Sequence, residues 1–174
     1  MPTETVLDLT QYLTFQVGGE EFGVEILRSK EILPFERVTR LPGMPASLRG
    51  VINLRGNVVP VIDLSLVFGM PETAVTKLTC IIIVSVTVEG KKMPLGLITE
   101  AVNQVVDIDA EDLQEPPTIG TRVKAEYLKK LGRSLSGFVL ILDIDKILTE
   151  GEYGELSRVV TEPGKLNLSQ RGPL

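Results

Sequence analysis

Short runs of aliphatic residues, each closed by a turn, dominate this sequence and restrict it to a β-rich fold. Apolar and polar residues alternate across 12–17 and again across 22–26, on either side of Gly18-Gly19. Period-two alternation around a glycine turn predicts a hairpin. Further strand-like runs follow at 50–64, 79–88, 93–98, 101–108 and 138–142.

The run at 50–64 predicts a second hairpin, because two apolar stretches flank Arg55-Gly56-Asn57. Gly56 fits a turn that requires positive φ. Gly50 fits a site where two strand backbones approach closely. Pro60 cannot donate a ladder hydrogen bond, so we expect its strand to lie at a sheet edge or to carry a bulge there.

Helical patterns are few. The residues 26–33 are consistent with a short helical turn that ends at Pro34. A firmer pattern places Val123, Tyr127, Leu128 and Leu131 on one helical face, with Gly132 as the C-terminal cap. About nine short strands with one real helix predict an all-β barrel or sandwich.

Composition argues against several function classes. Histidine is absent, which removes the commonest general base near neutral pH and the usual zinc ligand. The single cysteine, Cys80, lies in an apolar run and is expected to be a buried structural thiol. The net charge is −5 without a basic stripe, so nucleic acid is an unfavourable partner.

The domain boundaries follow from where the apolar pattern starts and fades. We expect one domain at 12–150, with 1–11 and 151–174 as flexible termini, because the pattern thins and glycine and proline recur beyond Glu150. No stretch approaches the roughly 18 apolar residues that span a bilayer, and the start lacks the regions of a signal peptide. These features predict a cytoplasmic protein that does not insert into a membrane.

A long segment, from Leu48 to Leu64, reads LRGVINLRGNVVPVIDL and closely resembles the signature of the CheW family of chemotaxis coupling proteins. The residues 20–26 upstream, and Gly96 and 102–105 downstream, resemble the family in the same order. The similarity extends from about Tyr12 to Leu148.

This resemblance implies two interlocked five-stranded SH3-like β-barrels that share an apolar core, with one or two short helices. It implies no active site, no cofactor and no metal, so the chain is expected not to be an enzyme. The implied partners are the cytoplasmic tips of chemoreceptors and the regulatory domain of the histidine kinase CheA. The protein would be recruited to membrane-associated receptor arrays and act through its surfaces in two-component signal transduction.

The resemblance also implies which residues face the receptor: Glu31, Arg55, Gly96, Val102 and Val105. Arg55 is the strongest candidate, because a guanidinium on a tight turn offers a rigid fork of donors, and an ion pair with Glu31 is possible. Gly50 and Gly56 are assigned structural roles in turns and close strand approach. Two departures from the family pattern are Ser29, where an aliphatic residue is common, and Glu100, where a shorter acid is common.

The sequence is also compatible with other functions. A CheW-like regulatory module, or a paralogue that serves a pilus or gene-regulation pathway, is the nearest alternative, although the start at Met1 and the short tail favour a stand-alone adaptor. A small-molecule-binding β-barrel enzyme would rely on carboxylates such as Asp63, Asp107 and Asp109, for which turns and strand ends give ordinary explanations. For kinase docking, the resemblance points to the first hairpin around Val17 to Phe22.

Overall fold

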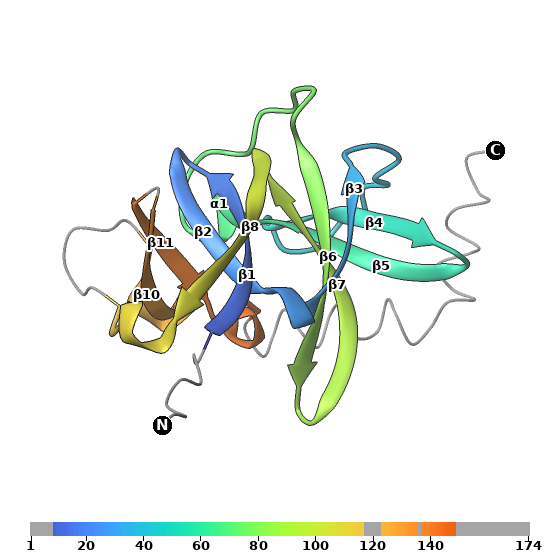
Figure 1. Ribbon diagram of the computed structural model, residues 1–174. Coiled ribbons are helices and arrows are strands. Elements are labelled where there is room, and N and C mark those ends of the chain that lie inside the picture. Colours follow the sequence, from blue (N-terminus) through green and yellow to red (C-terminus); the bar gives the residue numbers. More distant parts are fainter. Residues whose placement is uncertain (1–8, 117–122, 136, 149–174) are drawn as a thin grey trace.

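The computed structural model describes residues 9–116, 123–135 and 137–148, and they form two curled sheets (Figure 1). The predicted flexible termini lie largely outside these residues, although strand β1 already begins at Leu9. The strands of the six-stranded sheet are β1 (Leu9–Val17), β2 (Glu20–Glu25), β8 (Ala101–Asp109), β9 (Leu113–Gln114), β10 (Leu128–Ser134) and β11 (Gly137–Leu142). Those of the five-stranded sheet are β3 (Ser29–Pro34), β4 (Leu48–Leu54), β5 (Asn57–Asp63), β6 (Cys80–Val88) and β7 (Lys91–Thr99).

Helical structure is limited to short elements. A single-turn α-helix, α1 (Leu64–Val67), follows β5. The 3₁₀ turns are η2 (Ile26–Arg28), η3 (Ala110–Asp112), η4 (Ala125–Tyr127) and η5 (Ile144–Lys146). Asp63 begins α1 as its N-cap, because its side chain accepts a hydrogen bond from the Ser65 amide.

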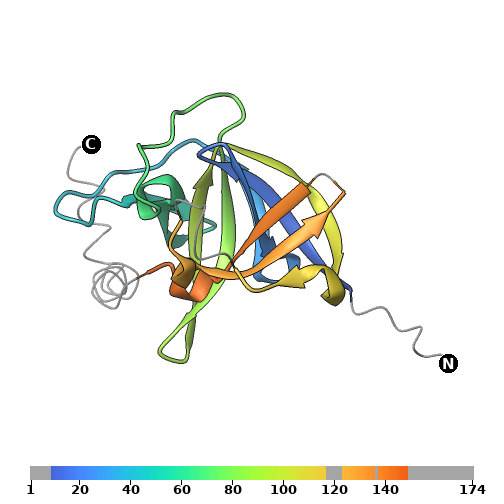
Figure 2. The same cartoon turned by 90° about the vertical axis from the view of Figure 1, so that its left-hand side faces the viewer.

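The six-stranded sheet is built from both ends of the chain. Its strand order is β8-β1-β2-β11-β10-β9, so that β1 and β2 from the start lie between β8 and β11 from the end (Figure 2). Strand β1 pairs antiparallel with β8, and β11 pairs parallel with β2. The intervening strands β3 to β7 form the five-stranded sheet, in the order β3-β6-β7-β5-β4.

The buried apolar residues form three clusters, and the largest is shared by the two sheets. The largest buried cluster joins Phe15 and Phe22 of the six-stranded sheet to Ile82 and Leu97 of the five-stranded sheet. Phe22 also stacks on Phe68, with ring centroids 5.1 Å apart. A smaller cluster belongs to the five-stranded sheet alone, and another to the six-stranded sheet alone. The predicted pair of barrels with a shared core is confirmed, with β9 as a sixth strand in one of them.

The predicted helix around 123–132 is wrong. The structure has the 3₁₀ turn η4 followed by strand β10, in which Leu128 and Gly132 are buried. The register of β10 against β11 shifts between Leu128 and Lys130. A 3₁₀ turn followed by an irregular strand spaces the apolar residues three or four apart, and this spacing imitated a helical face.

Two further predictions are corrected in detail. The helical turn at 26–33 is only η2, and the remainder is strand β3, whose last residue is Pro34. Pro60 does not lie in an edge strand, since β5 has β4 and β7 as neighbours. The pairing of β5 with β7 begins only at Val61, however, so Pro60 precedes that ladder.

Cys80 is partly exposed rather than buried. Its thiol donates a hydrogen bond to the Leu78 carbonyl at 3.3 Å. Partial burial raises the pKa of the Cys80 thiol, which disfavours the reactive thiolate.

Candidate recognition surface

The turn between β4 and β5 presents Arg55 at the tip of a tight hairpin. Arg55 and Gly56 have φ of 50° and 87°, which are the positive values of a type I′ turn. The Asn53 side-chain oxygen accepts a hydrogen bond from the Gly56 amide at 2.9 Å and closes the turn. A type I′ turn matches the twist of the flanking strands, so the position of the Arg55 backbone is firmly defined.

Arg55 reaches across to β3, where its Nη2 atom donates a hydrogen bond to the Glu31 carboxylate. The Arg55 side chain is nevertheless 71% exposed, and that of Glu31 is 28% exposed. The hydrogen bond from Arg55 lowers the pKa of Glu31, and the same contact raises the pKa of Arg55. Both groups are therefore charged near neutral pH, and most of the guanidinium remains accessible.

A groove of about 620 Å³ lies beside this ion pair. We call it the Arg55 groove. It is lined by Lys30, Glu31, the residues 54–59 of the hairpin, Ile83 and Pro94. An apolar floor with a charged rim is the composition expected of a protein-binding surface.

Gly96 lies under the same region but is buried in β7. It pairs with Ile83 of β6, which in turn pairs with Glu31. A Cβ atom at Gly96 would lie 2.9 Å from Ile81 Cγ2 and 3.1 Å from Val61 Cγ2. Gly96 therefore permits tight packing inside the barrel, and any effect on a partner would be indirect.

Val102 and Val105 belong to the other sheet, on β8, so the structure does not join them to the Arg55 groove. Val102 is half-buried and packs against the shared core. Val105 is 48% exposed on this edge strand. Thus Glu31 and Arg55 form one surface, Gly96 lies beneath it, and the two valines form part of another.

Gly50 permits the close approach of a neighbouring loop to β4. Thr39 and Val51 exchange two backbone hydrogen bonds of 2.8 Å, which brings Thr39 against the edge of β4. A Cβ atom at Gly50 would lie 2.1 Å from the Thr39 carbonyl oxygen. No side chain fits there without a backbone shift.

A buried charge network lies at the base of the same hairpin and was not predicted from the sequence. Arg49 Nη1 lies 3.2 Å from Asp63 Oδ2, and its Nε atom lies 3.0 Å from Glu72. Asp63 is fully buried and also accepts hydrogen bonds from Ser65 and twice from Thr73. Two charges within the same largely apolar run, Arg49 and Asp63, were the available signal, but their further partners Glu72 and Thr73 lie in a separate loop.

These contacts also bear on the carboxylates that an enzyme would need. All the hydrogen bonds of Asp63 are structural, and Asp109 caps η3 by accepting from the Glu111 amide. Asp107 is exposed on β8. Within 9–116, 123–135 and 137–148, no three His, Cys, Asp or Glu side chains are grouped so as to hold a metal.

The first hairpin, suggested for kinase docking, turns its large apolar side chains toward the core. Gly18-Gly19 forms the expected turn, but Val17 and Phe22 are fully buried. Their side chains belong to the shared core, because the inward face of β1 and β2 carries the apolar half of the alternation. Docking of a kinase at this hairpin stays a prediction, and it would have to use residues other than Val17 and Phe22.

Comparisons with known proteins place this architecture in a family. A sequence model of the CheW-like domain matches residues 11–152. The chain is 31% identical to the chemotaxis protein CheW of Klebsiella aerogenes over 149 residues, which covers 86% of this chain and 87% of that protein. It is 32% identical to the chemotaxis protein CheW of Treponema pallidum over 151 residues, with 86% and 88% covered.

A solved structure agrees with the sequence comparisons. The crystal structure of the scaffolding protein TtCheW from Thermoanaerobacter tengcongensis superposes with a TM-score of 0.73 and 28% sequence identity, covering 82% of this chain and 94% of that chain. The chain therefore belongs to the CheW-like domain family, which is a family of chemotaxis scaffold and adaptor proteins. None of the helices that the structure describes has the length and apolarity needed to cross a membrane.

Proposed function

We propose that this protein couples chemoreceptors to the histidine kinase CheA as a non-catalytic adaptor, and that the Arg55 groove faces the receptor. Family membership supports the coupling role. The observation that carries the assignment of the groove is an arginine with 71% of its side chain exposed, held on a type I′ turn and oriented by Glu31.

The physical case for Arg55 rests on preorganisation. Its backbone is fixed by the turn and its guanidinium is already directed by the Glu31 carboxylate, so binding would immobilise little further chain. Arginines held in this way are common interface hot spots, because the planar fork can donate to a partner carboxylate or backbone carbonyl. Val102 and Val105 would form a second, separate contact on β8, and Gly96 would act only through the packing beneath the groove.

The test is a pull-down with two baits, receptor cytoplasmic tips and the regulatory domain of CheA. We expect Arg55→Ala to weaken receptor binding by about tenfold or more, the usual size of a hot-spot truncation. Binding to the kinase domain should remain at the wild-type level.

Arg133→Ala provides a matched control. Arg133 is 66% exposed and pairs with Asp112 at 3.2 Å, but on the six-stranded sheet, away from the Arg55 groove. The Arg133→Ala variant should bind both baits at the wild-type level. Equal receptor binding by Arg55→Ala and wild type would remove Arg55 from the interface, and failure of the wild type to bind either bait would overturn the coupling role.

A pilus or gene-regulation pathway is the alternative destination for the same adaptor. The two differ in the receptor that is retained rather than in the fold. Pull-downs with receptor tips from each pathway separate the two alternatives. Only the cognate tips should be retained, and their retention should require Arg55.

A further inference from the structure

The edge of strand β6 is completed by two different structures along its length. Strand β3 pairs antiparallel with β6 only from Cys80 to Val84, because β3 begins at Ser29, opposite Val84. On the other side, β7 continues to pair with β6 as far as Val88. The residues 85–88 of β6 therefore have an edge that β3 leaves uncovered.

Two side chains from outside the five-stranded sheet cover this edge. Arg28 of η2 donates from Nε to the Ser85 carbonyl at 3.0 Å, and Asp145 of η5 accepts from the Thr87 amide at 2.8 Å. Arg28 Nη2 and Asp145 Oδ1 lie 2.5 Å apart and join the two. Arg28 thus supplies the donor, and Asp145 the acceptor, that the backbone of a longer β3 would have supplied.

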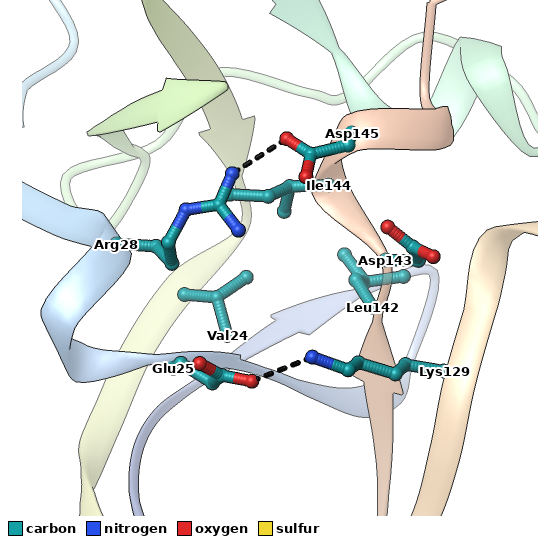
Figure 3. Close-up of a pocket in the computed structure, with 8 residues that line it drawn as sticks. All are labelled: Val24, Glu25, Arg28, Lys129, Leu142, Asp143, Ile144 and Asp145. Carbon is teal, nitrogen blue, oxygen red and sulfur yellow. Dashed lines mark hydrogen bonds and ion pairs between the residues drawn. The ribbon is translucent and has the colours of Figure 1, made fainter. Parts of the chain in front are cut away.

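These four groups connect segments that are distant in the chain. Element η2 is the first crossover between the sheets, and η5 follows the last strand of the six-stranded sheet. Figure 3 shows Arg28 and Asp145 joined to each other. Both line a small pocket of about 200 Å³, which Val24, Leu142 and Ile144 also line. We call the bonds among Arg28, Asp145, Ser85 and Thr87 the clasp.

A second ion pair in the same pocket offers an internal comparison. Lys129 Nζ lies 2.8 Å from Glu25 Oε2 (Figure 3). Glu25 is in β2 and Lys129 is in β10, so both belong to the six-stranded sheet. This pair does not cross between the sheets, whereas the clasp does.

We propose that the clasp fixes the orientation of the two barrels relative to each other, by fastening η2 and η5 to the uncovered edge of β6. The shared core holds the barrels together but is apolar and non-directional, whereas hydrogen bonds to Ser85 and Thr87 have defined directions. The proposal does not depend on the proposed function, because it concerns only the geometry of the free protein.

The experiment measures distances between spin labels on cysteines introduced at Asn57 of β5 and Asp107 of β8, in a chain that also carries Cys80→Ala. Both labelled positions are exposed, one on each sheet. We expect a narrow distance distribution in the labelled parent and a clearly broader one in Asp145→Ala and in Arg28→Ala. Lys129→Ala should keep the narrow distribution.

Amide hydrogen exchange provides a second readout at the clasp. The Thr87 amide should exchange about tenfold faster or more in Asp145→Ala, since it loses a charged acceptor. In Arg28→Ala the Asp145 carboxylate still accepts from the Thr87 amide, so the increase in its exchange rate should be smaller. If Asp145→Ala does not fold, the distance distribution of Arg28→Ala still decides the test. Distance distributions in the Arg28 and Asp145 variants as narrow as in Lys129→Ala would overturn the proposal.

Discussion

Two arginines of the same hairpin have opposite environments. Arg49, near the base, is 10% exposed and is held by Asp63, by Glu72 and by the ring of Phe35, which lies 5.2 Å away. Arg55, at the tip, is 71% exposed and has one carboxylate partner. One continuous sequence segment thus combines a structural charge and an accessible one, and burial of the side chain separates the two roles.

The largest expected effect is on stability, from removal of Arg49. Arg49→Ala leaves Asp63 buried without its cationic partner and should lower the free energy of unfolding by about 3–5 kcal/mol. Urea denaturation followed by circular dichroism measures the change.

Arg55→Ala is the matched variant, since it removes the same side chain from the tip. Its urea midpoint should stay close to that of the wild type, because the ion pair with Glu31 is solvent-exposed. Similar midpoints for the two variants would contradict the division between a structural and an accessible arginine.

Of the two glycines beside these arginines, the one near the base should again be the more important for stability. Gly50→Ala forces a Cβ atom to 2.1 Å from the Thr39 carbonyl oxygen and should cost about 3 kcal/mol. Gly56→Ala meets no atom within 4 Å, so only the left-handed backbone is strained, at about 1 kcal/mol. Thermal unfolding of the two variants in parallel gives the order, and a larger loss at Gly56 would refute it.

The smallest effect is the pH dependence of the Glu31 contact. Because Arg55 lowers the pKa of Glu31 below its ordinary value of 4.5, this contact stabilises the folded state above that value. The contribution is lost as the pH falls through the lowered pKa. Carboxyl titration by NMR should show this low pKa in the wild type.

In Arg55→Ala the Glu31 pKa should return toward its ordinary value, while Arg133→Ala should leave it unchanged. A low Glu31 pKa that persists without Arg55 would show that another group supports the carboxylate.

Sequence patterns succeeded where neighbours along the chain determine the structure. The hairpin turn at Arg55-Gly56 depends on the residues within it, and the strands on either side follow from local alternation. The two-barrel arrangement came from the family resemblance rather than from periodicity. The pattern at 123–132 misled because a 3₁₀ turn and a bulged strand reproduce helical spacing.

The parts that could not be predicted depend on distant contacts. The ion pair of Arg49 with Asp63 spans 14 residues, and that of Arg28 with Asp145 spans 117. Alternation places Val17 and Phe22 on the apolar face of the first hairpin, but it does not reveal that the other sheet covers that face. Charges within apolar runs signal that such partners exist, but they do not identify them.

The order of strands in the six-stranded sheet constrains how the protein folds during synthesis. The Thr14 hydroxyl bonds to the carbonyl of Gln104, 90 residues later, so β1 and β2 emerge from the ribosome long before the strands on either side of them. The β3 to β7 unit, by contrast, is contiguous and can pair first. Closing so long a loop makes folding slow and leaves the first hairpin with unpaired edges in the nascent chain.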